Sequence, residues 1–258
     1  MTEPNLLYHI SFIFSTALIK IPQFFYFIPI PRLKAVFTGN TRPCNQGVSG
    51  MEFSFHLYNK MAADGISMAA DKLLHVWQKS KMEGAGMRSQ QKNREKSTLK
   101  NPVIVCVGSD LAIGDSLGPI AGSMLKFKTQ GLGVFIYGTL AAPITAKEIR
   151  YMRTFLKETH RGAPVIAVDA AVGDAGDIGL LKISDTPLHP GAGANKQLGA
   201  IGDITVMGVV AEKSVANYGL LNTTRLNLVY SMAEIVSNGL SALLWEKCTQ
   251  EKIVEKHA

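Results

Sequence analysis

The stretch that decides the fold is Val103-Ile-Val-Cys-Val-Gly-Ser-Asp-Leu-Ala-Ile-Gly-Asp-Ser-Leu-Gly-Pro119. Its first five residues form a short apolar run typical of a buried strand, and the residues from Ser116 onward have the pattern of a helix. Open α/β sheets bind their ligands at such strand-to-helix turns. The glycines are spaced one residue too far for a phosphate loop, and Asp115 stands where the phosphate-binding lysine would be. Because a carboxylate repels phosphate, we exclude nucleotide binding by this turn.

Apolar runs and helical patterns continue to alternate after this turn. Further strands are predicted at residues 134–137, 164–168, 180–183 and 204–210, and helices at 116–126, 145–158 and 223–246. This alternation is typical of a sheet with crossover helices. It predicts one α/β domain over residues 101–247, followed by a tail at 248–258.

The first fifty residues differ from the rest of the chain. Residues 6–30 are apolar and long enough to span a membrane, but Lys20 and Pro22 lie near their middle. No basic region precedes them and no small-residue cleavage site follows, which argues against a signal peptide or a regular transmembrane helix. We interpret residues 1–50 as an apolar appendage, either a membrane anchor or the result of a misplaced start, with Met51 as the alternative start.

A helix and a linker are predicted between the appendage and the α/β domain. Within residues 51–82, Ile66, Leu73 and Leu74 recur at helical spacing and predict an amphipathic helix at 64–79 that packs on the main domain. Residues 83–100 form a basic linker, since residues 79–100 hold seven Lys or Arg against two Glu and so supply most of the chain's net charge of +7. No aromatic residues interleave these charges, so we expect no nucleic-acid partner.

Composition restricts the class of protein. The chain has 258 residues, 47% of them hydrophobic, which is enough to bury a substantial core. Its three cysteines, Cys44, Cys106 and Cys248, are odd in number and lack metal-type spacing. A reducing, cytoplasmic setting is therefore expected, and Cys106 is interpreted as a buried, unreactive thiol because it lies inside an apolar run.

Two aspartates are the best candidates for an active site. Asp115 stands at the start of the predicted helix, where it either serves a ligand or simply caps the helix. Asp169 follows the apolar run Val165-Ile-Ala-Val168 and is expected to point into the crevice at the carboxyl end of the sheet. Two carboxyl groups in one cleft would hold different pKa values and could act as general acid and general base on one water. The alternative role for Asp169 is to cap a loop.

A third feature is the Gly- and Pro-rich stretch at residues 184–196. It has no helical or strand periodicity and is predicted to be a binding loop or lid. His189, Asn195 and Lys196 are its candidate substrate-binding residues. Asp115, Asp169 and His189 together would form a site of two oxygens and one nitrogen suited to a divalent metal ion such as Ni²⁺, Zn²⁺ or Mn²⁺.

Five motifs, in order, carry a resemblance to a known family. They are Val-Cys-Val-Gly-Ser-Asp with Gly-Asp-Ser-Leu-Gly-Pro119, then Phe-Ile-Tyr-Gly-Thr-Leu140, Ile-Ala-Val-Asp-Ala170, Pro-Leu-His-Pro-Gly-Ala-Gly-Ala-Asn-Lys196 and Asn222-Thr-Thr-Arg-Leu226. Across residues 101–247 the chain resembles the YyaC family of sporulation proteins, which are described as spore proteases. That family in turn resembles the germination protease and the hydrogenase maturation endopeptidases.

The resemblance implies a fold and a site. The implied fold is a three-layer α/β/α sandwich with a five-stranded, mostly parallel sheet. The catalytic aspartate motifs of the germination protease are matched by Asp115-Ser-Leu-Gly-Pro119 and Val168-Asp169-Ala-Ala171. The nickel-binding pattern of the maturation endopeptidases would fall on Asp115, Asp169 and His189. The zymogen insertions of the germination protease have no counterpart here, so its tetramer and substrate are not carried over, and a homo-oligomer stays an open alternative.

Three functions are consistent with the sequence. The first is an endopeptidase of the sporulating cell, in the forespore or mother cell, which acts on proteins or peptides, including spore proteins, with an aspartate pair and no required cofactor. The second is a non-catalytic module that recognises a peptide or a metal-loaded partner through residues 185–203. The third is a metal-dependent hydrolase with another substrate, which a chelator would inactivate.

Overall fold

The structure, a computed structural model, describes residues 50–84, 100–190, 199–213 and 224–255. The strands are β1 (Glu52–His56), β2 (Val103–Cys106), β3 (Ile136–Tyr137), β4 (Val165–Gly173), β5 (Leu180–Ser184) and β6 (Ile204–Glu212). The helices are α1 (Ala62–Gly84), α2 (Leu117–Lys128), α3 (Ile149–Thr159) and α5 (Leu226–Glu255), with short 3-10 helices at Ile113–Ser116 and Ala175–Asp177. The predicted apolar appendage and most of the basic linker lie outside the described residues.

The strands form one mixed sheet in the order β1-β5-β6-β4-β2-β3. Neighbouring strands from β3 through β2 and β4 to β6 are parallel, whereas β5 runs antiparallel to both β6 and β1. The predicted α/β class is therefore confirmed, but the predicted count of five strands is wrong. The missed strand is β1, a five-residue edge strand with the sequence EFSFH. It pairs with β5, which follows more than a hundred residues later, so no local sequence pattern predicts this strand.

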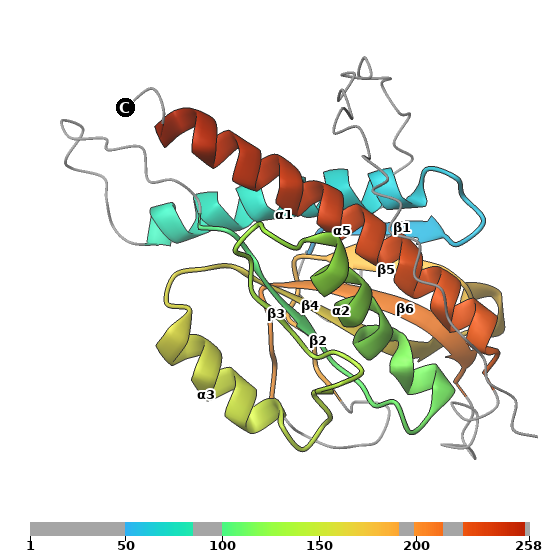
Figure 1. Ribbon diagram of the computed structural model, residues 1–258. Helices are drawn as coiled ribbons and strands as arrows, with labels where there is room; N and C mark the ends of the chain where they lie inside the picture. Colours follow the sequence, from blue (N-terminus) through green and yellow to red (C-terminus); the bar gives the residue numbers. More distant parts are fainter. Residues whose placement is uncertain (1–49, 85–99, 191–198, 214–223, 256–258) are drawn as a thin grey trace, which may run out of the picture. The chain divides into compact units, whose positions relative to one another are not determined.

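Helices cover both faces of the sheet, which gives three layers (Figure 1). On one face, α1, α2 and α5 pack together over the strands, and their shared core includes Leu73, Leu117 and Met232. On the other face, α3 covers β2 and β4 through Ile149 and Met152. The strand sequences explain this arrangement, since all four residues of β2 are buried and its side chains alternate between the two cores.

The first helix and the C-terminal region belong to this same unit. The predicted helix at 64–79 is confirmed and longer, and Ile66, Leu73 and Leu74 on it are fully buried in the core. The predicted boundary between residues 51–82 and the α/β domain is not a structural one, because β1 extends the sheet. The predicted tail from residue 248 is the last part of α5, which continues to Glu255.

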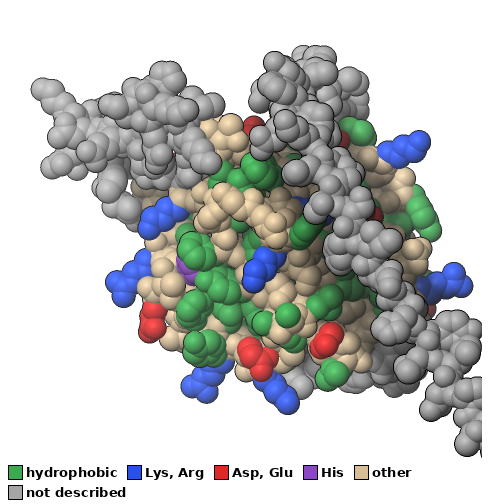
Figure 2. All heavy atoms as spheres, viewed as in Figure 1, with side chains coloured by type: hydrophobic (Ala, Val, Ile, Leu, Met, Phe, Trp, Pro, Cys, Tyr) green, Lys and Arg blue, Asp and Glu red, His purple; other side chains and the backbone are tan. Residues whose placement is uncertain are grey.

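The outer surface carries mixed side chains. Figure 2 shows one face of the molecule, where Lys and Arg side chains are dispersed singly among hydrophobic and acidic ones. Within the described residues, the stretch Leu226–Gln250 of α5 is long and apolar enough to cross a membrane. However, 56% of its most apolar window is buried inside the protein, which is also typical of a core helix.

Candidate active site

The turn between β2 and α2 holds Asp115 against the end of the strand. Gly108 N–H donates to the Ile144 carbonyl at 2.9 Å, and Ser109 N–H donates to the Asp115 carbonyl at 3.1 Å. Gly108 has φ +137°, and a Cβ there would lie 2.1 Å from the Asp115 carbonyl oxygen. Glycine is therefore required, because only a residue without a side chain lets the backbone of Asp115 come this close.

Asp115 does not cap α2. It lies within the 3-10 helix Ile113–Ser116, and the residue before α2 is Ser116. The Ser116 hydroxyl donates to the Ile113 carbonyl at 2.7 Å, and α2 has no side-chain cap hydrogen bond. The alternative that Asp115 is only a helix cap is therefore wrong, and its half-buried carboxyl group needs another explanation.

Asp169 lies inside β4 and not at its end, because this strand continues to Gly173. The neighbouring β2 stops at Cys106, which pairs with Val168. Asp169 is consequently the first residue of β4 beyond the end of β2, and on its other side it pairs with Met207 of β6. The loop-cap alternative for Asp169 is wrong, and the expectation that it faces the carboxyl end of β2 agrees with the register.

The chain path explains why these two strand ends make a crevice. From β2 the chain passes through α2 to β3 on the outer side, then returns through α3 to β4 on the inner side. The connections after β2 and β4 therefore leave in opposite directions across the sheet. Ligands of open α/β sheets bind at such switch points. Asp115 follows β2 and Asp169 is carried by β4, so both lie at this one.

The two carboxyl groups are electrostatically coupled. Burial raises the pKa of Asp115 to about 6, and a backbone hydrogen bond from Ser109 partly offsets this rise. The pKa of Asp169 is raised well above its usual value, first by burial and then by the negative charge of Asp115, while the Ala170 N–H opposes the rise. That N–H donates to Asp169 Oδ1 at 2.8 Å. Ionisation of Asp115 therefore opposes ionisation of Asp169, so the two groups titrate as a coupled pair in which Asp169 holds its proton to higher pH.

The structure places the histidine loop at the other edge of the sheet. β5 runs antiparallel to β6, so it ends with Ser184 beside Thr205, near the beginning of β6. The loop that follows is held there by the bridge between Leu188 and Ile201, and His189 is exposed. The prediction that His189 joins the two aspartates does not agree with this register, because β5 runs antiparallel and ends at the amino edge of the sheet. Asn195 and Lys196 lie outside the described residues.

The donor set for a metal ion is correspondingly smaller than predicted. In residues 50–84, 100–190, 199–213 and 224–255, no three His, Cys, Asp or Glu side chains form a group that could hold a metal ion. The predicted set of Asp115, Asp169 and His189 is therefore not assembled. Among the residues that the structure describes, the carboxyl groups of Asp115 and Asp169 are the donors at this site.

Sequence reasoning missed a second feature, at the amino edge of the sheet. A pocket of about 810 Å³ lies there, lined by residues of α1, α3 and the segment before β6. Neither Asp115 nor Asp169 lines this pocket. The available signal was the spacing of Arg153 and Lys157, which are one helical turn apart on α3.

Comparisons with known proteins agree with the motifs quoted above. A family model described as "Protein of unknown function (DUF1256)" matches residues 77–239. The uncharacterized protein YyaC of Bacillus subtilis is 39% identical over 158 residues, which is 61% of this chain and 77% of that protein. The crystal structure of a NiFe hydrogenase maturation protease, HycI from Thermococcus kodakarensis, covers 53% of this chain and 92% of its own, with 18% identity and a TM-score of 0.29. A TM-score this low supports no inference about fold or function.

Proposed function

The chain belongs to the DUF1256 family, and from its coupled aspartates we propose that it is an endopeptidase in which Asp115 and Asp169 activate water for peptide-bond hydrolysis. The observation that carries the proposal is that the turn after β2 and the register of β4 bring two carboxyl groups, Asp115 and the buried Asp169, to one switch point of the sheet. Two carboxyl groups that share one proton are the chemical requirement for general acid and base catalysis without a covalent intermediate.

The pKa values assign the two roles. Asp115, with a pKa of about 6, is mostly ionised at pH 7 and is the general base that takes a proton from water. Asp169 keeps its proton and is the general acid that donates to the substrate carbonyl or the leaving amine. The number of protons on the pair does not change in this step, because Asp115 gains one proton and Asp169 donates one.

A covalent route has little support among the described residues. Burial raises the pKa of Cys106 to about 12, and the side chain is fully buried in the core, so no thiolate is available. The turn between β2 and α2 does contain a Gly-x-Ser-x-Gly sequence, Gly114-Asp-Ser-Leu-Gly118. Its Ser116 hydroxyl is buried and donates to the Ile113 carbonyl at 2.7 Å, whereas the nucleophile of such a turn has an exposed hydroxyl. An attacking water held between two carboxyl groups needs neither nucleophile.

The setting is proposed from the family resemblance. We place the protein in the cytoplasm of a sporulating cell, in the forespore or mother cell, with protein or peptide substrates that include spore proteins. No metal is required by an aspartate pair that shares a proton. A divalent ion such as Ni²⁺, Zn²⁺ or Mn²⁺ is the alternative, and it would displace that proton because metal ligands must be deprotonated.

The test is proteolysis of a protein extract from sporulating cells, with new chain termini identified by mass spectrometry. The wild-type chain is compared with Asp115→Asn, Asp169→Asn and an EDTA-treated sample. We expect specific new termini from the wild type, with or without EDTA, and a loss of about 10²- to 10⁴-fold in cleavage rate for each variant.

Asp110→Asn is the matched control, because Asp110 lies in the same turn and is exposed. It should cleave like the wild type. Normal cleavage by both site variants would refute the proposal. A folded wild type that cleaves nothing would favour a recognition module acting through residues 185–203, and activity abolished by EDTA and restored by metal would favour a metal-dependent hydrolase.

A further inference from the structure

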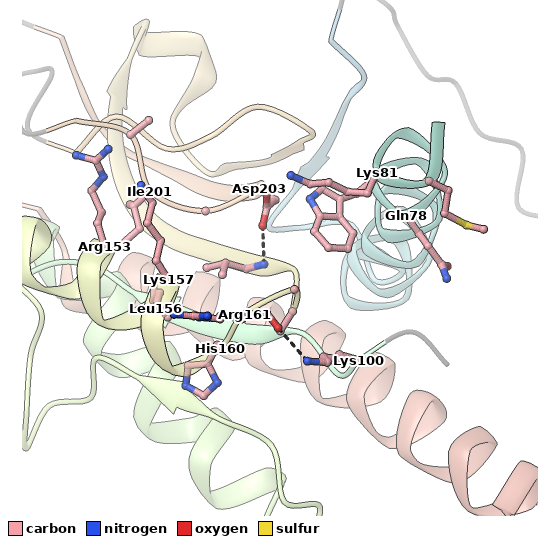
Figure 3. Close-up of a pocket in the computed structure, with 17 residues that line it drawn as sticks. Gln78, Lys81, Lys100, Arg153, Leu156, Lys157, His160, Arg161, Ile201 and Asp203 are labelled. Atoms are coloured by element: carbon pink, nitrogen blue, oxygen red, sulfur yellow. Dashed lines mark hydrogen bonds between the residues drawn. The ribbon is translucent and has the colours of Figure 1, made fainter. Parts of the chain in front are cut away.

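The amino edge of the sheet carries a pocket that the proposed peptidase does not use. Its volume is about 810 Å³, within the range of roughly 300–1,000 Å³ of small-molecule sites. Figure 3 shows Arg153 and Lys157 on one wall, formed by α3, and Gln78 and Lys81 of α1 on the facing wall. Val165 lines this pocket and Asp169 is four residues further along the same strand, so the two sites lie at different levels of the sheet.

The side chains that line the pocket carry more positive than negative charge. Five cationic side chains line it, against one carboxylate: Lys81, Lys100, Arg153, Lys157 and Arg161, with Asp203. The carboxylate is already engaged, because Asp203 accepts a hydrogen bond from Val165 N–H at 2.9 Å. The ion pairs found among the described residues involve other lysines and His75, not these five side chains. A concave surface lined by one sign of charge concentrates the field and attracts anions.

Histidine does not add to this charge. His160 also lines the pocket, but its ring nitrogen Nε2 lies 2.7 Å from the Tyr137 hydroxyl oxygen, and burial lowers its pKa. The imidazole is therefore neutral near pH 7. The positive potential comes from lysine and arginine alone and persists across the physiological pH range.

Apolar side chains line the same pocket, including Trp77, Leu156 and Ile201. Lys81 Nζ lies 5.6 Å from the centre of the Trp77 ring, so this cation covers the indole face. The indole N–H of Trp77 is buried and has no hydrogen-bond acceptor in the part of the chain that the structure describes. A buried donor without an acceptor is costly, which points to a ligand oxygen at this wall of the pocket.

One of the cations lies close to the backbone of the chain before β6. Gly199 has φ +80°, and a Cβ at this position would lie 2.2 Å from Arg153 Nη1. The guanidinium of Arg153 therefore lies directly against the backbone before β6. A guanidinium at this position can form paired hydrogen bonds to phosphate oxygens.

We propose that this pocket binds a nucleoside oligophosphate. The five cations suit a chain of several phosphates, and the Trp77, Leu156 and Ile201 surface suits the planar body of a base. A ligand with a single carboxylate would leave most of the positive charge of the pocket uncompensated. A nucleic acid needs an extended groove, whereas these cations converge from two helices on one pocket. This site is independent of the aspartate pair, so Asp169→Asn should bind the same ligand as the wild type.

The chain itself provides a reporter for this binding. It has two tryptophans, Trp77 in the pocket and Trp245, which is 48% exposed on α5. In a Trp245→Phe background the emission of Trp77 is observed alone while tripolyphosphate, which does not absorb light at these wavelengths, is titrated in low-salt buffer. Calorimetry on the native full-length chain then compares ATP, tripolyphosphate and adenosine. We expect saturable binding, with ATP tighter than tripolyphosphate and both weakened by added salt.

A matched pair of double variants separates the pocket from general attraction. Arg153→Gln/Lys157→Gln removes two charges from the pocket, and Lys147→Gln/Arg150→Gln removes two charges from the same region outside it. We expect the first pair to weaken ATP binding at least tenfold, equivalent to about 1.4 kcal/mol, and the second to change it less than about twofold. Lys81→Gln, on the opposite wall, is a second test if α3 does not tolerate its variant.

Three results would overturn the inference. They are no saturable binding by ATP up to about 5 mM, equal weakening by the two double variants, and ATP no tighter than tripolyphosphate. The first would show that the pocket is not an anion site. The second would show that net charge alone is responsible, and the third would remove the base-binding role of the apolar wall.

Discussion

At the scale of single residues, the pair of Asp115 and Asp169 combines burial with like charge. Each carboxyl group is desolvated, and the group that ionises first makes ionisation of the second harder. Asp115 ionises first because it is less buried than Asp169, while each carboxyl group has one backbone hydrogen bond that favours its charged form. The order of the two titrations follows from these contacts and sets the roles of base and acid.

The pH dependence of peptidase activity should be bell-shaped. We expect kcat/KM to rise as pH increases through about 6, where Asp115 ionises, and to fall at higher pH, where Asp169 loses its proton. Initial rates on one cleaved peptide from pH 4 to pH 10 would measure both limbs. An activity that is flat through pH 6 would contradict the assignment of Asp115 as base.

The raised pKa values of Asp115 and Asp169 also lower the stability of the folded chain at neutral pH. Both carboxyl groups have a higher pKa in the folded than in the unfolded chain, so the folded state binds more protons, and its stability falls as pH rises from about 4 through the folded pKa values. Asp169→Asn keeps an oxygen that can accept the Ala170 N–H and removes the titration. We expect it to raise the free energy of unfolding by about 1–3 kcal/mol at pH 7 and by almost nothing below pH 4.

Guanidinium unfolding at pH 4 and pH 7 would test this prediction. Asp110→Asn serves as the control, since this carboxyl group is exposed in the same turn. A gain for Asp169→Asn that does not change with pH would mean that burial of a titrating carboxyl group is not its cause.

At the scale of elements, α1 shows how a helix outside the predicted domain becomes part of it. Its buried stripe packs beside α5 in the larger core, and β1 before it pairs with β5. Gly239 of α5 allows close contact, because a Cβ there would lie 2.6 Å from the Ala63 carbonyl oxygen. The two helices therefore approach closely through a residue without a side chain.

Substitutions on the two faces of α1 should separate its core role from its exposed one. Leu73→Ala removes a fully buried side chain and should lower the free energy of unfolding by about 2–5 kcal/mol. Met68→Ala, on the same helix with a side chain 49% exposed, should change it by less than about 0.5 kcal/mol. Chemical unfolding measures both, and equal effects would show that α1 is not packed into the core.

At the scale of the whole molecule, the sheet separates two kinds of chemistry. The carboxyl end of β2 holds the acidic pair, and the amino edge holds the basic pocket. The antiparallel strand β5 carries the histidine loop to the basic edge. A binding role for His189, Asn195 or Lys196 stays a prediction, and the structure locates His189 at the edge away from the aspartates.

The extent of the folded unit can be tested by truncation. A chain that begins at Met51 keeps β1 and α1, whereas one that begins at Asn101 loses the edge strand and exposes the apolar surface of α5. We expect cooperative thermal unfolding from the first chain. From the second we expect no cooperative transition, together with binding of a hydrophobic dye, because the apolar area that it exposes is a large part of the core. Equal melting temperatures would refute this division.

The sequence by itself determined the α/β class, five of the six strands, the four α-helices of the described residues and the candidacy of both aspartates. These features depend on local periodicity and on turns whose chemistry is local, such as the glycine at Gly108. The tertiary structure decided which side chains meet. Only the pairing of distant strands shows that β1 joins the sheet and that β2 ends beside Asp169. The same pairing shows that β5 is antiparallel to β6, which places His189 at the edge of the sheet away from the aspartates. Strand direction and register depend on contacts between residues far apart in the chain, and no local pattern encodes them.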